Sequence, residues 1–315
     1  MPRIALHCSH EQIPPSQLLR AVERAEQAGF TAGMSSDHFA PWSRRQGESG
    51  FAWSFLGAAL ARTSLPFGVV NAPGQRYHPA IVAQAAASLC EMFPGRLWVA
   101  LGTGEAANEH ITGEVWPAKH ERTERLAECV EIMRALFAGE EVSHMGHVVV
   151  DRARLWTRPE TPPELLCAAV SEQTAAWGGT WADGLATVNA PVEHLRKMLD
   201  AFGREGRKVL QVHVSWAPTE EEALAIAHDQ WRTNVFDPPA CWDIDTPEAF
   251  DAAAAFVRPE DVATKVLVSA DLQRHAGWLQ EYAALGFDDI AIHHVGQDLD
   301  AFIDAFGSHV LPELS

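Results

Sequence analysis

Cysteine is scarce in this sequence, and no two cysteines stand close enough to form a recognisable pair. The chain has 315 residues and 5 cysteines, at positions 8, 90, 129, 167 and 241. This spacing excludes a C-x-x-C redox motif and a cysteine zinc cluster, and an odd number does not suit a disulfide framework. Because most of the cysteines fall inside apolar runs, we expect buried free thiols in a reducing compartment.

Positive charge and long apolar runs are also in short supply. The chain has 24 basic and 42 acidic residues, which gives a formal net charge of −18. Such a surface repels nucleic acid and anionic membranes. No apolar stretch is long enough to span a bilayer, and MPRIALHCSH (1–10) leads into a strand-like run without a signal peptide. We expect a cytoplasmic protein whose partner is a small molecule, with no nucleic-acid or membrane partner.

Familiar metal and nucleophile motifs are missing as well. The sequence has no H-E-x-x-H, no Cys/His cluster, no G-x-S-x-G and no P-loop. We therefore expect no bound metal and no hydrolysis through a covalent intermediate. His293 and His294 are neighbours on a strand-like run, so their side chains should point to opposite faces. His144 and His147 flank a glycine typical of a β-hairpin.

What the sequence does contain is a regular alternation of strand-like and helical segments. The strand-like runs cover residues 3–8, 30–35, 66–71, 96–101, 165–170, 184–188, 209–216 and 289–294. This alternation predicts parallel β/α units, and the number of units favours a (β/α)8 TIM barrel over a doubly wound sheet. We expect a single domain over 1–315. Its insertions are expected near 38–50, 140–160 and 231–260. The segment 231–260 is expected to be irregular, and the segments 140–160 and 231–260 are expected to shape the substrate pocket.

Polar residues follow several of the strand-like runs. They are Asp37, His38, Asn71, Gly102, Thr103, Gly104, Glu105, Asn108, Ser171, Asn189, His293 and His294. In a (β/α)8 barrel the active site lies at the C-terminal ends of the strands. We therefore expect these residues to converge on one mouth.

The first of these clusters is SSDHFAPW (35–42). Asp37 could cap a helix or a turn, with His38 a loop histidine whose hydrogen bonds are satisfied. Alternatively, His38 exchanges protons with a ligand near neutral pH. Trp42 could cover one face of a flat aromatic ligand.

The second cluster is GTGEAANE (102–109). Its glycines let the backbone approach a ligand closely, Thr103 and Asn108 add hydrogen-bonding groups, and Glu105 is a candidate acid or base. A strand-to-helix turn with a capping acid explains the same residues. The pattern is not G-x-G-x-x-G, because Ala107 stands at the third glycine position.

Taken together, the motifs resemble those of the bacterial-luciferase-like superfamily of flavin-dependent oxidoreductases. Within it, the sequence is most similar to the group of coenzyme F-420-dependent glucose-6-phosphate dehydrogenases, near a branch that uses FMN. The strings that carry the resemblance are SSDHFAPW (35–42), GVVNAPGQRYHPAIVAQA (68–85), PGRLWVALGTGEAANEHITG (94–113), GGTWADGL (178–185) and GFDDIAIHHVG (286–296).

The resemblance implies that the mouth of the barrel holds a flavin or a deazaflavin. His38 and Glu105 would be the two acid–base groups beside the reactive carbon. Trp42 would lie against the substrate or the ring, and Asp37 would contact the ring. The resemblance also implies a homodimer.

Further residues are implied as cofactor contacts. Gly104 and Asn108 would help to bind the cofactor, and Val70–Asn71 matches the site of a non-prolyl cis peptide that supports the ring. Such a bond costs about 3–4 kcal/mol and persists only when its surroundings enforce it. Val170 and Ser171 stand where relatives bind the cofactor phosphate, and a serine at a helix start resembles the FMN-binding members. FMN is therefore slightly favoured, with coenzyme F-420 (F420, a deazaflavin) as the alternative.

The expected reaction is hydride transfer between the flavin-type cofactor and a small polar, alcohol- or sugar-like substrate. Glucose 6-phosphate is not expected, because Pro191 and either Asp300 or Ala301 stand where that group places phosphate-binding cations. Lys265 is the cation expected nearby. One alternative is an FMN-dependent monooxygenase that uses oxygen and a flavin reductase partner. Another is a flavin-binding barrel without turnover.

Overall fold

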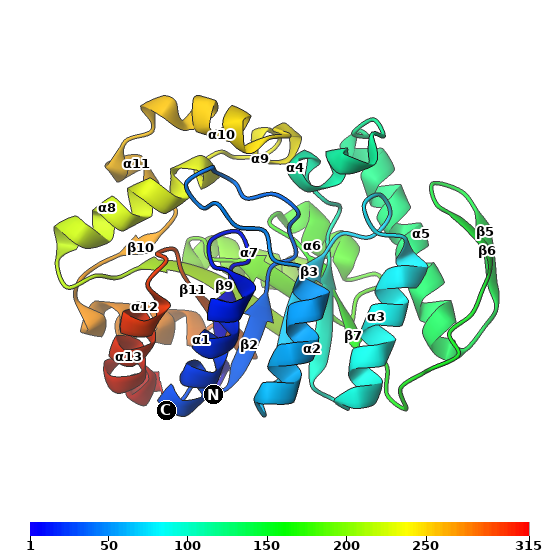
Figure 1. The fold of residues 1–315 in the computed structure, drawn as a ribbon, viewed down its shortest axis with the longest axis horizontal. Coiled ribbons are helices and arrows are strands. Elements are labelled where there is room, and N and C mark those ends of the chain that lie inside the picture. The colour runs from blue at the N-terminus through cyan, green and yellow to red at the C-terminus, as the bar shows by residue number, and fades with distance from the viewer. Residues whose placement is uncertain (315) are drawn as a thin grey trace.

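The computed structural model describes residues 1–314, and in that range eight parallel strands close into a barrel (Figure 1). Around the barrel the strands are β1 (Arg3–Cys8), β2 (Ala32–Ser35), β3 (Phe67–Asn71), β4 (Leu97–Leu101), β7 (Glu164–Ala168), β8 (Gly184–Val188), β9 (Arg207–Ser215) and β11 (Asp289–His294). β11 pairs with both β9 and β1, and β9 pairs with β8, which closes the ring. The predicted (β/α)8 barrel is confirmed.

Helices follow the strands and form the outer layer. They are α1 (Pro15–Ala28), α2 (Ala52–Arg62), α3 (Pro79–Met92), α5 (Lys119–Ala138), α6 (Glu172–Gly178), α7 (Val192–Phe202), α8 (Glu220–Trp231), α12 (Leu272–Ala283) and α13 (Leu299–His309). The signals at their ends are local. α3 begins at Pro79, and α1 ends at Gly29, whose left-handed φ of 102° lets its N–H bond the last carbonyls of the helix.

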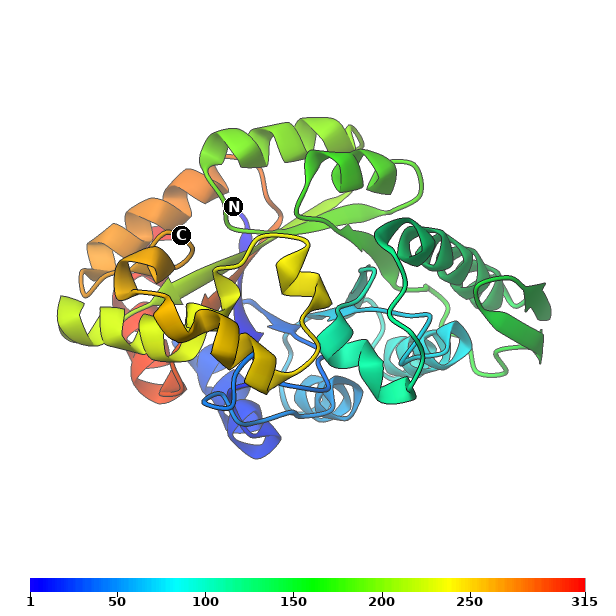
Figure 2. The ribbon, with the colours of Figure 1, turned by 90° about the horizontal axis from the view of Figure 1, so that it is seen from above.

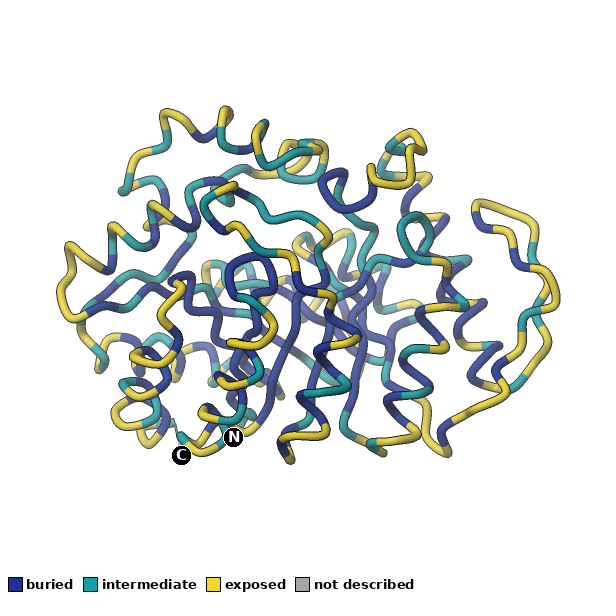
Figure 3. The backbone as a smooth tube through the Cα atoms, viewed as in Figure 1, coloured by how far each residue is buried: buried dark blue, intermediate teal, exposed yellow. Residues whose placement is uncertain are grey.

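The lower part of the barrel interior is packed solid, which confines any cavity to the upper end. The Trp98 indole on β4 fills the space beside Gly68 on β3, where a Cβ atom would lie 1.9 Å from the ring. On the outer face of the strands, Gly33 makes the same kind of room for Phe67, which packs against Phe55 of α2. Figure 3 shows the barrel strands as the most continuously buried part of the chain. Each large apolar side chain buried there contributes about 1.5–3 kcal/mol.

The segment around 140–160 forms the expected β-hairpin. β5 (Val142–Met145) pairs antiparallel with β6 (Val149–Ala153) around Gly146, and the imidazoles of His144 and His147 contact Glu128 and Glu124 of α5. The hairpin extends from the side of the barrel, away from the mouth (Figure 1). The expectation that it shapes the pocket is wrong, because none of its residues lines the cavity described below.

The segment 231–260, expected to be irregular, instead contains short helices. These include α9 (Ala240–Asp243) and α10 (Pro247–Ala253), with α11 (Pro259–Val262) and the short strand β10 (Leu267–Val268) after them. Thr246 caps α10, and Phe250 is fully buried. Ser43 Oγ lies 2.7 Å from Asp251 Oδ1, which ties the loop after β2 to α10. Seen from above, α9 and α10 lie over the mouth of the barrel beside α4 (Ala106–Glu109) (Figure 2).

The cysteines and the helix lengths bear on two further expectations. Cys8, Cys90, Cys129 and Cys167 are buried free thiols, as predicted, and Cys241 is partly buried. No helix within residues 1–314 is both long enough and apolar enough to cross a membrane.

Candidate active site

A cavity of about 300 Å³ opens at the C-terminal ends of the strands. Its volume is at the lower end of the range for small-molecule sites. Of the residues predicted for the site, those that line the cavity are Asp37, His38, Trp42, Val70, Asn71, Gly104, Glu105, Asn108 and Val170. Ser171 does not line it. The convergence of the strand ends β2, β3, β4 and β7 on one mouth follows from the parallel closure of the barrel.

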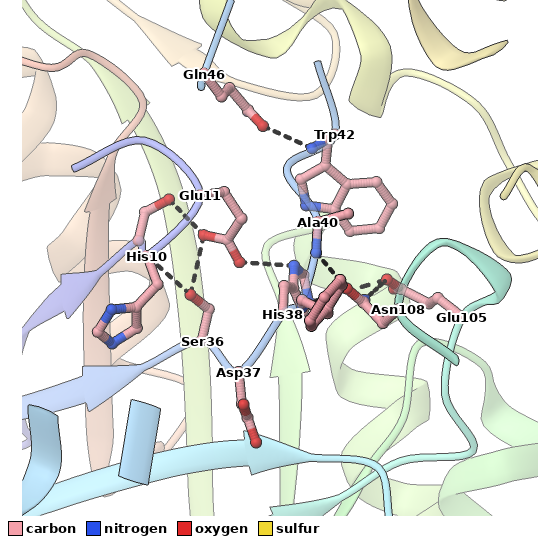
Figure 4. Close-up of polar contacts among 12 residues, drawn as sticks. His10, Glu11, Ser36, Asp37, His38, Ala40, Trp42, Gln46, Glu105 and Asn108 are labelled. Carbon is pink, nitrogen blue, oxygen red and sulfur yellow. Dashed lines mark hydrogen bonds and ion pairs between the residues drawn. The ribbon is translucent and has the colours of Figure 1, made fainter. Parts of the chain in front are cut away.

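His38 lies between two carboxylates, one of them a residue that the sequence patterns did not reveal. Its Nδ1 atom is 2.6 Å from Glu11 Oε1, and its Nε2 atom is 3.9 Å from Glu105 Oε2. Glu11 belongs to the buried loop after β1, and its Oε2 atom accepts hydrogen bonds from the hydroxyls of Ser9 and Ser36. Figure 4 shows Glu11 between Ser36 and His38. These contacts fix the imidazole with Nε2 toward Glu105.

The pairing with Glu11 sets the charge of His38. Burial alone would lower the pKa of His38, but the charge of Glu11 and its hydrogen bond outweigh burial and raise the pKa to about 9. Burial alone would raise the pKa of Glu11, but His38 and the Ser9 hydroxyl lower it well below its usual range. The pair is therefore an imidazolium and a carboxylate at neutral pH.

The pKa of Glu105 is shifted in the opposite direction from that of Glu11. Burial raises its pKa to about 7, and Glu11 and Glu109 add to the rise while His38 opposes it. The residue precedes α4, but its side chain makes no capping hydrogen bond there. The interpretation of Glu105 as a helix cap is therefore wrong. Its carboxyl can give up or take up a proton near neutral pH.

Trp42 packs against His38. Their ring centroids are 5.2 Å apart at an interplanar angle of 75°, and the ring centroid of Phe250 of α10 lies 5.3 Å from that of Trp42. The backbone N–H of Trp42 donates to Gln46 Oε1 at 2.8 Å. Trp42 is therefore a fixed wall beside the imidazole, supported by the segment that covers the mouth.

Asp37 belongs to a buried network in the wall of the cavity. Its carboxylate accepts hydrogen bonds from Asn71 Nδ2 at 2.6 Å and from the Tyr77 hydroxyl at 3.0 Å, and Arg76 lies 3.7 Å away. Arg76 also pairs with Glu109. These contacts occupy the Asp37 carboxylate, whereas the Oδ1 atom of Asn71 is buried without a hydrogen-bond partner in residues 1–314. Asn71 therefore presents the unsatisfied polar atom of this network.

Asn108 and Gly104 are positioned by the turn after β4. The side-chain oxygen of Asn108 accepts hydrogen bonds from the backbone N–H groups of Phe39 and Ala40, at 2.8 and 3.3 Å, and its amide donates to Glu105. Asn108 thus ties the loop of His38 to the turn of Glu105. Gly104 has a φ of 81°, in the left-handed region that favours glycine.

The predicted cis peptide at Val70–Asn71 is wrong. Across residues 1–314 the structure has a single cis peptide bond, Pro238–Pro239. Val70 and Asn71 instead continue β3 in regular register with Ala100 and Leu101 on β4. That ladder satisfies the backbone, and no local feature enforces the costlier isomer.

The region proposed for the cofactor phosphate contains the Val170–Ser171 step and the cationic side chain of Lys119. Val170 is 44% exposed at the cavity edge, and Ser171 caps α6 by accepting from the Thr174 N–H. Lys119, the first residue of α5, also lines the cavity and donates to Thr103 Oγ1 at 2.9 Å. Burial, the largest cause, and Arg122 lower the pKa of Lys119 to about 8. The described chain contains no carboxylate in ion-pair contact with Lys119.

The cavity therefore contains cations that the sequence comparison did not anticipate. Arg76 and Lys119 line it, and Arg76 is neutralised by Asp37 and Glu109. Lys265, expected nearby, does not line the cavity and pairs with Asp237 at 2.8 Å.

The side of the cavity formed by β1, β9 and β11 carries three histidines. His7, His213 and His293 all line it. His213 Nδ1 lies 3.1 Å from His293 Nδ1, and the His7 and His293 rings are 4.7 Å apart. As predicted, His294 points the other way, where it stacks on Phe302 of α13 with centroids 4.6 Å apart.

Sequence reasoning missed several lining residues, among them Glu11, Lys119 and His213. Glu11 stands three residues after the first strand-like run, so the rule applied to the other strand ends would have found it. His213 lies inside a strand, and only the inward-facing alternation of β9 marks it. Lys119 has no local signal, since a lysine at a helix start is slightly unfavourable.

Within residues 1–314, no group of three or more His, Cys, Asp or Glu side chains is arranged to bind a metal ion. The three cavity histidines contact one another through one hydrogen bond, between His213 and His293, and through ring packing.

The chain as a whole is similar to several known proteins. Residues 1–289 match the family described as luciferase-like monooxygenase. The F420-dependent glucose-6-phosphate dehydrogenase of Microbacterium testaceum is 32% identical over 99% of this chain and 97% of its own. The F420-dependent hydroxymycolic acid dehydrogenase of Mycobacterium tuberculosis is 34% identical over 97% of this chain and 86% of its own. An F420-dependent secondary alcohol dehydrogenase, solved with an F420–acetone adduct, superposes with a TM-score of 0.91 at 28% identity, covering 100% of both chains.

Proposed function

The chain belongs to the luciferase-like monooxygenase family and is a flavin- or deazaflavin-dependent oxidoreductase, and we propose that it is an F420-dependent dehydrogenase of a small polar alcohol. The observation that carries the proposal is the arrangement of His38 between Glu11 and Glu105 at the cavity. That arrangement supplies proton transfer, and a cofactor must supply the hydride chemistry.

The donor set of the cavity fits a polar, ring-shaped cofactor with an anionic tail. Asn71 offers an unsatisfied buried oxygen, Val70 gives an apolar wall, and the turn at Gly104 leaves backbone close to the cavity. Lys119 and the Val170–Ser171 step lie at the edge where an anionic tail would be balanced. Although the sequence slightly favoured FMN, the relatives named for F420 make F420 the better-supported cofactor.

The bound deazaflavin would accept the hydride from an alcohol or deliver one to a carbonyl. His38 would handle the proton of the substrate oxygen. Because the pKa of His38 is about 9, its resting form at neutral pH is the imidazolium, which donates to a carbonyl oxygen. In the alcohol-oxidising direction His38 must first be neutral, and at pH 7 only about 1% of it is.

Glu105 and Glu11 would have different roles in this proposal. Glu105, with a pKa of about 7, would exchange the proton on the cofactor side of the cavity. Glu11 is a positioning residue, since its contacts are to His38, Ser9 and Ser36 rather than to a ligand. Trp42 would close the substrate side.

The substrate class follows from the remaining charges. Arg76 is already neutralised by Asp37 and Glu109, and Lys119, which donates to Thr103, is the cation that we assign to the cofactor tail. A sugar phosphate would need several cations on the substrate side. A small alcohol or sugar without phosphate is therefore the proposed substrate, and glucose 6-phosphate is not. Assembly as a homodimer stays a prediction.

The test is an anaerobic assay of the purified protein with F420, in which propan-2-ol is the first alcohol probe and FMN replaces F420 in a parallel series. We expect F420 to bind and to lose its absorbance on reduction, without oxygen. An oxygen requirement with reduced FMN would instead support the monooxygenase alternative. Tight binding without turnover over a broad alcohol panel, unaffected by His38→Ala, would support a non-catalytic binding barrel.

A further inference from the structure

We propose that a directional hydrogen-bond chain, Gln12–His293–His213, presents the Nε2 atom of His213 to the cavity as a fixed acceptor for an O–H or N–H group of the ligand. Nothing in the proposed reaction uses these residues. The chain of hydrogen bonds belongs to the ligand-free protein, whereas the identity of the ligand group rests on the proposed function.

The chain begins at Gln12, whose amide orientation is determined by its surroundings. The Nε2 atom of Gln12 lies 2.6 Å from the backbone oxygen of Val295, which can only accept a hydrogen bond. The same nitrogen lies 3.2 Å from Gln230 Oε1. Gln230 itself donates to Asp229 through its own nitrogen, so its oxygen is also an acceptor. The Oε1 atom of Gln12 must therefore face His293.

The tautomer of His293 follows from this orientation. Its Nε2 atom lies 2.8 Å from Gln12 Oε1, so Nε2 must carry the proton. His293 is 2% exposed, and burial together with the neighbouring His7 and His213 lowers its pKa well below the ordinary value. A neutral imidazole with a proton on Nε2 has a bare Nδ1, which accepts.

The next step fixes His213. Its Nδ1 atom is 3.1 Å from the bare Nδ1 of His293, so the Nδ1 of His213 must donate. Burial lowers the pKa of His213 to about 4, so its ring is neutral too and Nε2 holds a lone pair. The Trp231 ring packs on both imidazoles, with centroids 4.9 and 4.7 Å away, and prevents either ring from turning freely.

The lone pair of His213 is accessible to a ligand. His213 is only partly buried and lines the cavity. Nearby His7, 4% exposed, also lines the cavity, and its Nδ1 atom is buried without a hydrogen-bond partner in the described chain. A fixed acceptor attracts a hydroxyl or an N–H and repels a carbonyl or phosphate oxygen. The donor could be the imide N–H of the deazaflavin ring or a second hydroxyl of the substrate.

The chain of hydrogen bonds can be tested without any cofactor. We would label the histidines with ¹⁵N and record two-bond ¹⁵N–¹H correlations on the ligand-free protein, with His213→Gln and His293→Gln used for assignment. We expect a neutral ring protonated on Nδ1 for His213 and a neutral ring protonated on Nε2 for His293. A protonated Nε2 on His213, in either charge state, would overturn the proposal.

The ligand group is tested with His213→Leu, which removes the acceptor, and His213→Gln, whose side-chain oxygen can replace Nε2. His309→Leu, an exposed position on α13, is the matched control. If the cofactor ring is the donor, the Kd for F420 should rise about 10-fold in His213→Leu and largely recover in His213→Gln. Fluorescence of F420 gives the Kd directly.

If F420 affinity is unchanged, the second source is examined with propane-1,2-diol and 1,2-dimethoxypropane, added to the protein with and without F420. We expect the diol, and not the ether, to shift the His213 Nε2 resonance. If neither F420 nor the diol perturbs this atom, the ligand assignment is wrong. If F420 fails to bind the unaltered protein while the tautomers are as expected, the proposed function fails and the hydrogen-bond chain remains.

Discussion

Histidines on two sides of the same cavity have different charges: one is cationic and the other is neutral. His38, on the β2 side, is an imidazolium with a pKa of about 9, whereas His213, on the β9 side, has a pKa of about 4. Burial lowers both values, so burial does not distinguish them. What differs is the partner, because His38 contacts the carboxylate of Glu11 and His213 contacts another neutral imidazole.

The difference shows that a single buried carboxylate divides the cavity into a proton-transfer side and a recognition side. Glu11 compensates the cost of burying one positive charge, and no equivalent carboxylate pairs with His213 or His293 in residues 1–314. A neutral histidine keeps one bare nitrogen and can read a donor group, whereas an imidazolium can only give up a proton.

The largest effect is expected from removing the charged histidine. His38→Ala should lower turnover of F420 by about 10²–10⁴-fold, since a positioned acid–base group is lost. The Kd for F420 should change little, because the contacts of His38 are to the two glutamates and Trp42. If turnover and cofactor binding disappear together, His38 is structural.

Glu11→Gln should make His38 resemble His213. Without the carboxylate, burial should bring the pKa of His38 below its usual value near 6.5, and alcohol oxidation should then depend on pH around or below neutrality. In the unaltered protein, oxidation should instead rise with pH up to about 9 as His38 loses its proton. At pH 7, carbonyl reduction should fall by about 10–100-fold. Glu141→Gln, an exposed glutamate, is the control, and an unshifted pH profile in Glu11→Gln would contradict the role of Glu11.

The barrel and the mouth were predictable from sequence because both depend on local patterns. Alternating apolar runs marked the strands, and polar residues at the ends of β2, β3 and β4 did converge. The division of the cavity was not predictable, because Glu11 acts through a buried contact with a residue 27 positions away. Helices α9 and α10 were missed for a similar reason. Each is short and is stabilised by tertiary contacts, such as that between Asp251 and Ser43.

The contributions of His38 and His213 to the free energy of unfolding should depend on pH in opposite directions. The folded pKa of His38 lies above its unfolded value, so its contribution is complete below about pH 6.5 and is lost as pH rises through 9. The difference between the two pKa values corresponds to roughly 3–4 kcal/mol. The folded pKa of His213 is depressed, so its contribution is complete above pH 6.5 and is lost as pH falls toward 4. Urea unfolding of Glu11→Gln should lose the alkaline decline and keep the acidic one, and an alkaline decline of unchanged size would exclude the pair as its source.

The smallest effect is expected one residue from the hydrogen-bond chain. His294 faces outward from β11, stacks on Phe302, and leaves its buried Nδ1 atom without a hydrogen-bond partner in the described chain. His294→Leu removes that unsatisfied atom and keeps an apolar contact, so the free energy of unfolding should change by less than about 1 kcal/mol. Turnover should stay within about twofold, because β-strand alternation keeps position 294 outside the cavity. His293→Leu is the same substitution on the face of β11 that points into the cavity. It should remove the hydrogen bond to His213, so that His213 no longer has a single tautomer. Equal effects of the two substitutions on the His213 resonances would mean that the face of the strand, and with it the recognition side of the cavity, has been assigned wrongly.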